Sequence, residues 1–167
     1  MSKIRLMIIT PLTQYQADDG DLVTVTTKNG AEGFMQGHVP TIVPIIPGPL
    51  RYRIPADNAV DPDGAWRCFF TSVGYAEVTP TEVMIIVTAA EWAADIDVER
   101  AQKALERATA RIQNPTASQR DLIHGRHAIR RAKARIHVAE KYGNKISLKQ
   151  DHSEQASTKK KRLKNHF

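Results

Sequence analysis

The stretch Asp95-Ile96-Asp97-Val98-Glu99-Arg100-Ala101 marks the point at which the chain changes from strands to helices. It carries three carboxylates, which the positive end of a helix dipole favours, and Asp97 can cap the first turn. Beyond it, small and aliphatic residues recur at helical intervals of four, three and four: Ala101, Leu105, Ala108 and Ile112. This spacing predicts a helix with one apolar stripe.

A second helix is predicted beyond Asn114-Pro115, which stops the first. Ser118 and Asp121 make a capping-box pair at its start, and Tyr142-Gly143-Asn144 closes it. Its stripe also has helical spacing: Leu122, Gly125, Ile129, Ala132, Ile136 and Ala139. Residues 93–143 therefore predict an antiparallel helical hairpin, whose small seam residues allow a close approach but bury little area. We expect the hairpin to rely on other surfaces or to be movable.

Upstream of the hairpin, residues 1–92 indicate short strands separated by Gly and Pro turns. The expected strands are 4–10, 22–27, 41–46, 50–54, 66–73, 75–78 and 83–88, with a solvated hairpin loop at 58–64. Strands at this spacing are typical of a sandwich or small barrel. The predicted class is α+β, with an N-terminal antiparallel β-sandwich (1–92), a C-terminal two-helix antiparallel hairpin (93–143) and a basic disordered tail (144–167).

Charge divides the chain in the same way. Residues 1–92 hold 6 basic and 10 acidic residues, residues 93–143 hold 11 and 6, and residues 144–167 hold 7 and 2. The basic character of this 167-residue chain therefore belongs to its C-terminal half, which indicates two modules with different partners. The tail is read as a solubilising end, with binding to nucleic acid or anionic lipid as its alternative.

Several classes of function are excluded by composition and motif. A single cysteine, Cys68, excludes an internal disulfide framework and a Cys-rich zinc module, and it is expected to be a small core residue. The absence of a long apolar run and of a secretory leader indicates a soluble protein from a reducing compartment. No phosphate loop, zinc-protease motif or nucleophile elbow is found, and we expect no metal site. An enzyme acting alone is therefore not expected.

Four quoted stretches, in order, resemble the epsilon subunit of the rotary F-type ATP synthase. They are Gly30-Ala31-Glu32-Gly33-Phe34-Met35-Gln36-Gly37-His38-Val39-Pro40, Pro47-Gly48-Pro49-Leu50-Arg51, Gly74-Tyr75-Ala76-Glu77-Val78, and Ala90-Glu91 followed by 95–101. The resemblance covers residues 3–142 and is to the bacterial or chloroplast type, equivalent to the mitochondrial delta subunit. It implies a β-sandwich followed by two helices.

The resemblance implies a non-catalytic central-stalk subunit of a proton-translocating ATP synthase. Such a subunit couples c-ring rotation to ATP synthesis through gamma and opposes ATP hydrolysis through its C-terminal helices. The implied partners are gamma, the c-ring and the catalytic alpha and beta subunits, with only indirect membrane contact and no nucleic acid. The implied location is the cytoplasmic face of the bacterial inner membrane, or the stromal face of the thylakoid. The alternative function is a stand-alone adaptor that holds nucleic acid through the basic hairpin and tail.

A nucleotide site is also implied, with ATP as a regulatory ligand and no required cofactor. In some bacterial members, an Ile/Leu-Asp-x-x-Arg-Ala motif with downstream arginines binds ATP. The matching residues here are Glu91, Ile96, Asp97, Arg100, Ala101, Arg107, Arg131 and Arg135. Arginine forks suit phosphate oxygens, whereas a carboxylate can accept from the adenine amino group. The alternatives are a solvated face paired with Glu99, Glu106 and Glu140, or docking on an acidic surface of the beta subunits.

The glycine-punctuated stretch 30–40 is the implied contact with the c-ring, while another face of the sandwich meets gamma. Its candidate contact residues are Glu32, Phe34, Met35 and His38. Exposed, Phe34 and Met35 would form an apolar contact patch; buried, they would close the sandwich. Either role, or both, fits the sequence.

Overall fold

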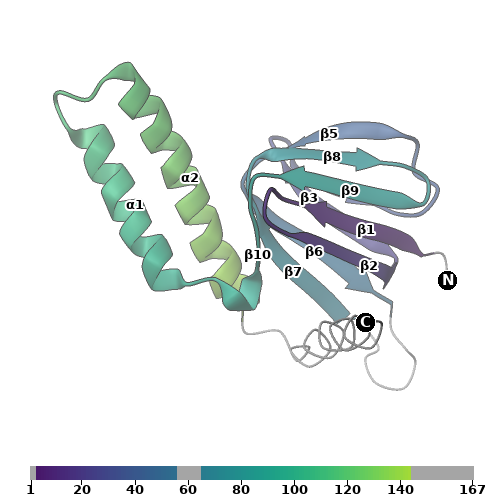
Figure 1. The fold of residues 1–167 in the computed structure, drawn as a ribbon. Helices are drawn as coiled ribbons and strands as arrows, with labels where there is room; N and C mark the ends of the chain where they lie inside the picture. Colours follow the sequence, from purple (N-terminus) through teal and green to yellow (C-terminus); the bar gives the residue numbers. More distant parts are fainter. Residues whose placement is uncertain (1–2, 56–64, 144–167) are drawn as a thin grey trace, which may run out of the picture.

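The computed structural model describes residues 3–55 and 65–143, and in them ten strands precede two helices (Figure 1). The first five strands are β1 (Ile4–Ile9), β2 (Gln14–Gly20), β3 (Leu22–Thr27), β4 (Gly30–Phe34) and β5 (Thr41–Ile45). The next five are β6 (Gly48–Ile54), β7 (Ala65–Thr71), β8 (Gly74–Val78), β9 (Glu82–Val87) and β10 (Ala90–Trp92). A 3-10 turn, η1 (Ala93–Asp95), leads to α1 (Val98–Gln113) and α2 (Gln119–Tyr142). The predicted α+β class is confirmed.

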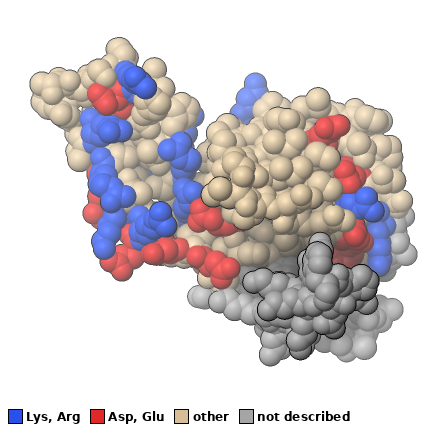
Figure 2. All heavy atoms as spheres, viewed as in Figure 1, with Lys and Arg blue, Asp and Glu red and all other residues tan. Residues whose placement is uncertain are grey.

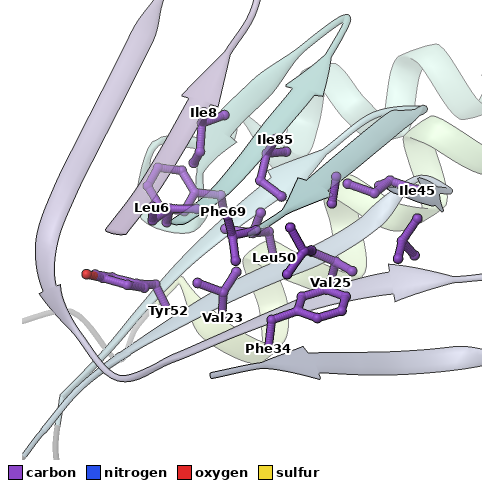
Figure 3. Close-up of a cluster of buried hydrophobic side chains, with 14 of the residues drawn as sticks. Leu6, Ile8, Val23, Val25, Phe34, Ile45, Leu50, Tyr52, Phe69 and Ile85 are labelled. Atoms are coloured by element: carbon purple, nitrogen blue, oxygen red, sulfur yellow. The ribbon is translucent and has the colours of Figure 1, made fainter. Parts of the chain in front are cut away.

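The strands form two five-stranded sheets packed as a sandwich. One sheet has the order β2-β1-β9-β8-β5 and the other the order β10-β7-β6-β3-β4. Apolar side chains from the two inner faces fill the space between the sheets, as Figure 3 shows for Leu6, Val23 and Phe69. Every pairing is antiparallel except that of β1 with β9, which is parallel. This one departure from an antiparallel sandwich joins strands too distant in sequence for a hairpin to set their direction.

Three strands escape prediction from the sequence: β2, β4 and β10. In β2 only Ala17 and Gly20 are buried, so its polar composition hides the strand. The strand β4 lies within the glycine-punctuated stretch that reads as a loop, and Gly30 begins it with a φ of 116°. Strand β10 has only three residues. Each lies at the edge of a sheet and pairs with one neighbouring strand, so ladder pairing rather than local composition determines them.

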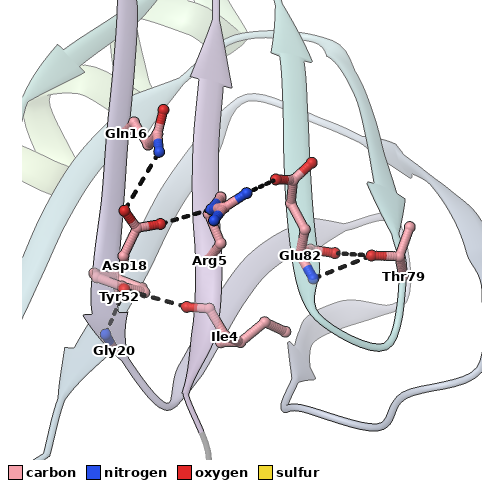
Figure 4. Close-up of polar contacts among 8 residues, drawn as sticks. All are labelled: Ile4, Arg5, Gln16, Asp18, Gly20, Tyr52, Thr79 and Glu82. Carbon is pink, nitrogen blue, oxygen red and sulfur yellow. Dashed lines mark hydrogen bonds and ion pairs between the residues drawn. The ribbon is translucent and has the colours of Figure 1, made fainter.

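Polar contacts fix the edge of the first sheet (Figure 4). Arg5 on β1 lies between Asp18 on β2, with Nε 2.7 Å from Oδ1, and Glu82 on β9, with Nη1 3.4 Å from Oε2. The buried Tyr52 hydroxyl accepts from the Gly20 amide and donates to the Ile4 carbonyl at 3.3 Å. These contacts fasten the edge strand β2 to both sheets.

The caps predicted for the helical hairpin are present. The Asp97 carboxylate accepts the Arg100 amide at 2.8 Å and so begins α1. Ser118 and Asp121 form a reciprocal capping box at the start of α2. A Cβ at Gly125 would lie 2.3 Å from Cγ2 of Ile112, so only glycine permits this approach of the two helices.

A second, smaller core attaches the hairpin to the sandwich. Its buried members are Cys68 and Phe70 from β7, Ala93, Ile96, and Val138 from α2. The hairpin therefore relies on another surface, as its thin seam predicts. Cys68 is 3% exposed and is the core residue expected, and burial raises the pKa of its thiol to about 12. The predicted loop at 58–64 and the predicted tail at 144–167 lie outside the described residues.

Candidate functional site

A pocket of about 390 Å³ lies between the two helices, next to the connection from the sandwich. It contains seven of the eight residues predicted for the nucleotide site. Its lining is Glu91, Asp95, Asp97, Arg100, Ala101, Ala104, Arg107, Ala128, Arg131, Ala132 and Arg135. We call it the arginine pocket. Its volume is within the range of roughly 300–1,000 Å³ typical of small-molecule sites.

Helical spacing explains why the arginines converge. Arg100 and Arg107 are seven residues apart on α1, and Arg131 and Arg135 are four apart on α2, so each pair shares one face of its helix. Alanines from both helices separate the two pairs and leave room between them. Figure 2 shows Lys and Arg gathered along both helices, with acidic side chains near the base of the hairpin. The pocket therefore faces cationic side chains on two walls and carboxylates at its base.

Arg135 is already engaged within the protein. Its Nε and Nη2 both donate to Oε1 of Glu91, at 2.9 and 2.7 Å. Its guanidinium also lies 4.3 Å from the centre of the Phe70 ring. Arg135 thus links α2 to β10 and β7, and the pair that it makes with Glu91 forms part of the pocket wall.

The other three arginines of the pocket make no ion pair with any residue that the structure describes. Arg100 and Arg107 are exposed, and Arg131 is half-buried. Glu99 instead pairs with Lys103, and Glu106 accepts from the Gln102 amide at 3.5 Å. None of the carboxylates suggested as partners for a solvated face, Glu99, Glu106 and Glu140, therefore pairs with an arginine of the pocket. Three unpaired guanidinium groups create a positive potential suited to an anion.

The remaining predicted residues of the nucleotide motif have structural positions. Asp97 lines the pocket while its Oδ1 caps the Arg100 amide. Ile96 lies outside the pocket lining and is buried in the second core, where it anchors the turn that carries Asp97. Ala101 is buried and forms part of the pocket wall. Asp95, which the sequence placed near a helix start but not in the site, also lines the pocket.

The predicted contact residues at 30–40 divide into buried and exposed groups. Phe34 is 2% exposed and closes the sandwich, with the His38 ring edge-on to it at 5.2 Å. Glu32 accepts from the Thr27 hydroxyl at 2.8 Å. Met35 is 53% exposed and is available to a partner. Phe34 therefore packs inside the sandwich, whereas Met35 lies on the surface, where a contact patch was expected.

An apolar surface on the outer face of the first sheet was not assigned from the sequence. Cross-strand register places Met7 beside Met84, Ile9 beside Ile86, Ile86 beside Tyr75, and Tyr75 beside Pro44. Ile42 lies on the same face of β5 and is 68% exposed, with Glu77 of β8 between it and Met84. We call these seven apolar residues the outer apolar face. The sequences of β1 and β9 could have indicated this face, because they are apolar at nearly every position. A strand with one solvated face instead alternates apolar and polar residues.

Neither a metal-binding cluster nor a membrane-spanning helix is present in the part of the chain that the structure describes. No group of three or more His, Cys, Asp or Glu side chains within 3–55 and 65–143 is arranged to hold a metal ion. No helix in the same residues is long and apolar enough to cross a membrane.

Comparison with known proteins matches both parts of the chain. The family model for the beta-sandwich domain of the ATP synthase delta/epsilon chain matches residues 3–93. The model for the long alpha-helix domain of the same chain matches residues 94–140. The ATP synthase epsilon chain of Macrococcus caseolyticus is 36% identical over 140 residues, which is 83% of this chain and 98% of the relative. That of Syntrophobacter fumaroxidans is 37% identical over 139 residues, covering 83% and 97%.

A solved structure has the same fold. A chain in the Euglena gracilis mitochondrial ATP synthase, solved as its OSCP/F1/c-ring assembly, superposes with a TM-score of 0.66 and 26% identity over 80% of this chain and 79% of that one. The chain therefore belongs to the delta/epsilon chain family of ATP synthase. Its relatives at 36 and 37% identity are bacterial epsilon chains, so the resemblance read from the sequence is confirmed, and with it the role of a non-catalytic subunit.

Proposed function

We propose that the chain is a coupling and regulatory subunit in the central stalk of a proton-translocating F-type ATP synthase. The sandwich links gamma to the c-ring, and the helical hairpin opposes ATP hydrolysis when it leaves the sandwich. The complex would hold the chain at the cytoplasmic face of a bacterial inner membrane, or at the stromal face of a thylakoid. The observation that carries the proposal is a hairpin that, among the described residues, is attached by a small core with five buried members and by one ion pair, beside a pocket in which three of the four arginines are unpaired.

The outer apolar face supports attachment to gamma. Monomeric proteins rarely leave an apolar surface of this kind uncovered, and Ile42 and Tyr75 are exposed on it at 68% and 42%. Met35 and Val39 are exposed apolar residues within the 30–40 stretch, and they suit the contact with the c-ring. Two separate apolar contacts on one rigid sandwich are what a subunit needs to transmit rotation between two partners.

The attachment of the hairpin supports a switch between two states. A bistable element requires a small free-energy difference, and a small core with one ion pair provides less adhesion than the main core of the sandwich. In the extended state, the basic faces of both helices become available to the acidic surfaces of the catalytic beta subunits. The same arginines then serve docking in one state and line the pocket in the other.

The arginine pocket supports ATP as the ligand that favours the folded state. Its walls come from β10, η1, α1 and α2, so the site is complete only when the hairpin is closed and docked. Arg100, Arg107 and Arg131 are free to bind phosphate oxygens, and the carboxylates at the base can accept from the adenine amino group. A ligand that binds only the closed form shifts the population toward it.

Calorimetric titration of ATP into the full chain tests the nucleotide site. Arg100→Ala and Arg131→Ala remove one pocket arginine from each helix, and Arg126→Ala is the matched control because Arg126 is exposed on α2 outside the pocket lining. We expect saturable binding that is lost in the two pocket variants and kept in the control. The absence of a binding signal at millimolar ATP would contradict the nucleotide site and leave docking as the role of the arginines. The proposed place in the stalk does not depend on this result.

A further inference from the structure

A second groove, of about 840 Å³, lies on another side of α2, between that helix and the outer face of the second sheet. The wall formed by α2 is cationic and carries Arg130, Arg131, Lys133 and Lys141, and Arg51 from β6 adds a guanidinium group on the sheet side. None of these five side chains makes an ion pair with a described residue, and the described lining holds no carboxylate. We call it the basic groove. It differs in this respect from the arginine pocket, which has carboxylates at its base.

The opposite wall of the basic groove, formed by the sandwich, is apolar apart from Arg51. Ile46, Pro47, Pro49 and Val73 form it, and Ile46 and Val73 are 40% and 52% exposed. The hydroxyl of Thr26 between the walls donates to the Pro49 carbonyl at 2.9 Å, so it is satisfied within the protein. A ligand that fits must therefore present negative charge to one side and apolar groups to the other.

The length of the groove limits the kind of ligand. Its lining on α2 runs from His127 to Tyr142, which is about 22 Å at the rise of an α-helix. An extended peptide covers that distance in about seven residues, and alternate side chains of such a peptide point to opposite sides. A nucleic acid would supply charge but needs stacking partners, and Tyr142 is the one Phe, Tyr or Trp side chain in the described lining, which also holds His127 and His137.

We propose that the basic groove binds an extended acidic segment of another polypeptide, in which carboxylates alternate with apolar side chains. The carboxylates face Arg130, Lys133 and Lys141, and the apolar side chains rest on Ile46 and Val73. The groove exists while the hairpin is docked, so this contact holds the folded state through a surface that shares only Arg131 with the arginine pocket. The inference does not depend on ATP binding, and the arginine pocket can fail its own test without affecting it.

The test is fluorescence anisotropy of the full chain with a labelled eight-residue peptide of alternating Glu and Leu. Two further peptides distinguish the contributions of the two walls to binding. A peptide of alternating Glu and Ser keeps the charge, and a peptide of alternating Gln and Leu keeps the apolar side chains. The groove variant is Arg130→Glu with Lys133→Glu. Its matched control is Arg120→Glu with Arg126→Glu, which makes the same change of charge at exposed positions of the same helix outside the lining. Both variants retain the C-terminal residues, so any contribution from these is common to them.

We expect the Glu–Leu peptide to bind about tenfold more weakly to the groove variant than to the control, because two attractive contacts become repulsive. Val73→Glu should also weaken binding, and the Glu–Ser and Gln–Leu peptides should bind more weakly than Glu–Leu. Equal binding by the groove variant and the control would overturn the proposal. Equally tight binding of the Glu–Ser peptide, or of an oligothymidylate of the same charge, would overturn it too, since the groove would then be a general polyanion surface.

Discussion

Arg135 on α2 donates both Nε and Nη2 to a single carboxylate oxygen of Glu91 on β10, at 2.9 and 2.7 Å. The two residues are 44 positions apart and belong to different units of the chain, one to the sandwich and one to the hairpin. Both side chains are partly shielded from water, with exposed fractions of 24% and 37%. The pair is the one salt bridge between a strand and a helix among the described residues, and it sits directly on the second core.

Removing this pair should loosen the docking of the hairpin. Glu91→Gln deletes the charge while keeping the shape, and we expect a loss of about 1.5 kcal/mol in the closed state. Cys68 is covered by this docking and is the single cysteine of the chain, so its alkylation reports opening. The rate of Cys68 alkylation should rise roughly tenfold.

The control for this measurement is Lys103→Ala, which removes the exposed Glu99–Lys103 pair on α1 away from the sandwich. Its alkylation rate should equal that of the unmodified chain. If Glu91→Gln and Lys103→Ala label at the same rate, the Arg135–Glu91 pair does not hold the hairpin.

Gly125 sets how closely the two helices approach. In Gly125→Ala the new methyl group would fall 2.3 Å from Cγ2 of Ile112, and the helices must separate. We expect a loss of about 1–3 kcal/mol in hairpin stability, seen as a lower melting temperature of the helical signal in circular dichroism. Adding Ile112→Ala removes the obstructing methyl group and should recover part of the loss. A double variant that is less stable than either single variant would contradict this account.

Local signals in the sequence predicted the helices better than the strands. Asp97, Ser118 and Asp121 act within three residues of their partners, so their capping roles could be read directly. Strand β2 depends on its pairing with β1 and not on an apolar pattern of its own, and the parallel pairing of β1 with β9 joins residues from distant parts of the chain. The arginines of the nucleotide motif could be named, but the engagement of Arg135 with Glu91 could not, since it depends on how α2 lies on the sandwich.

The capping box should make the start of α2 sensitive to acid. Hydrogen bonds from Ser118 hold the pKa of Asp121 below its usual value. A carboxylate with a lowered folded-state pKa contributes stability above its unfolded pKa, near 3.8, and loses it as pH falls through the lower folded value. Helix melting between pH 5 and pH 2 should therefore show an acid-sensitive component that Asp121→Asn lacks. Identical pH profiles for the two chains would rule out this coupling.

ATP should protect Cys68 if it binds the closed hairpin. A ligand at ten times its dissociation constant lowers the population of the ligand-free open state about elevenfold. The alkylation rate should fall by that factor in the unmodified chain and stay constant in Arg100→Ala, which keeps the docking contacts but lacks one pocket arginine. Protection that persists in Arg100→Ala would show that ATP acts away from the arginine pocket.

The outer apolar face should carry the attachment to gamma. Ile42→Lys with Tyr75→Lys places two charges on this face at exposed positions, and a lysine at 42 lies across the strand pair from Glu77, so it adds no like-charge repulsion. We expect loss of co-purification with gamma, because central apolar anchors each contribute about 2 kcal/mol or more to an interface. Leu12→Lys is the control, since Leu12 is 92% exposed but lies in the turn between β1 and β2, outside the outer apolar face. An intact complex with the double variant would mean that gamma binds elsewhere, and the stretch around Met35 and Val39 would be the next surface to change.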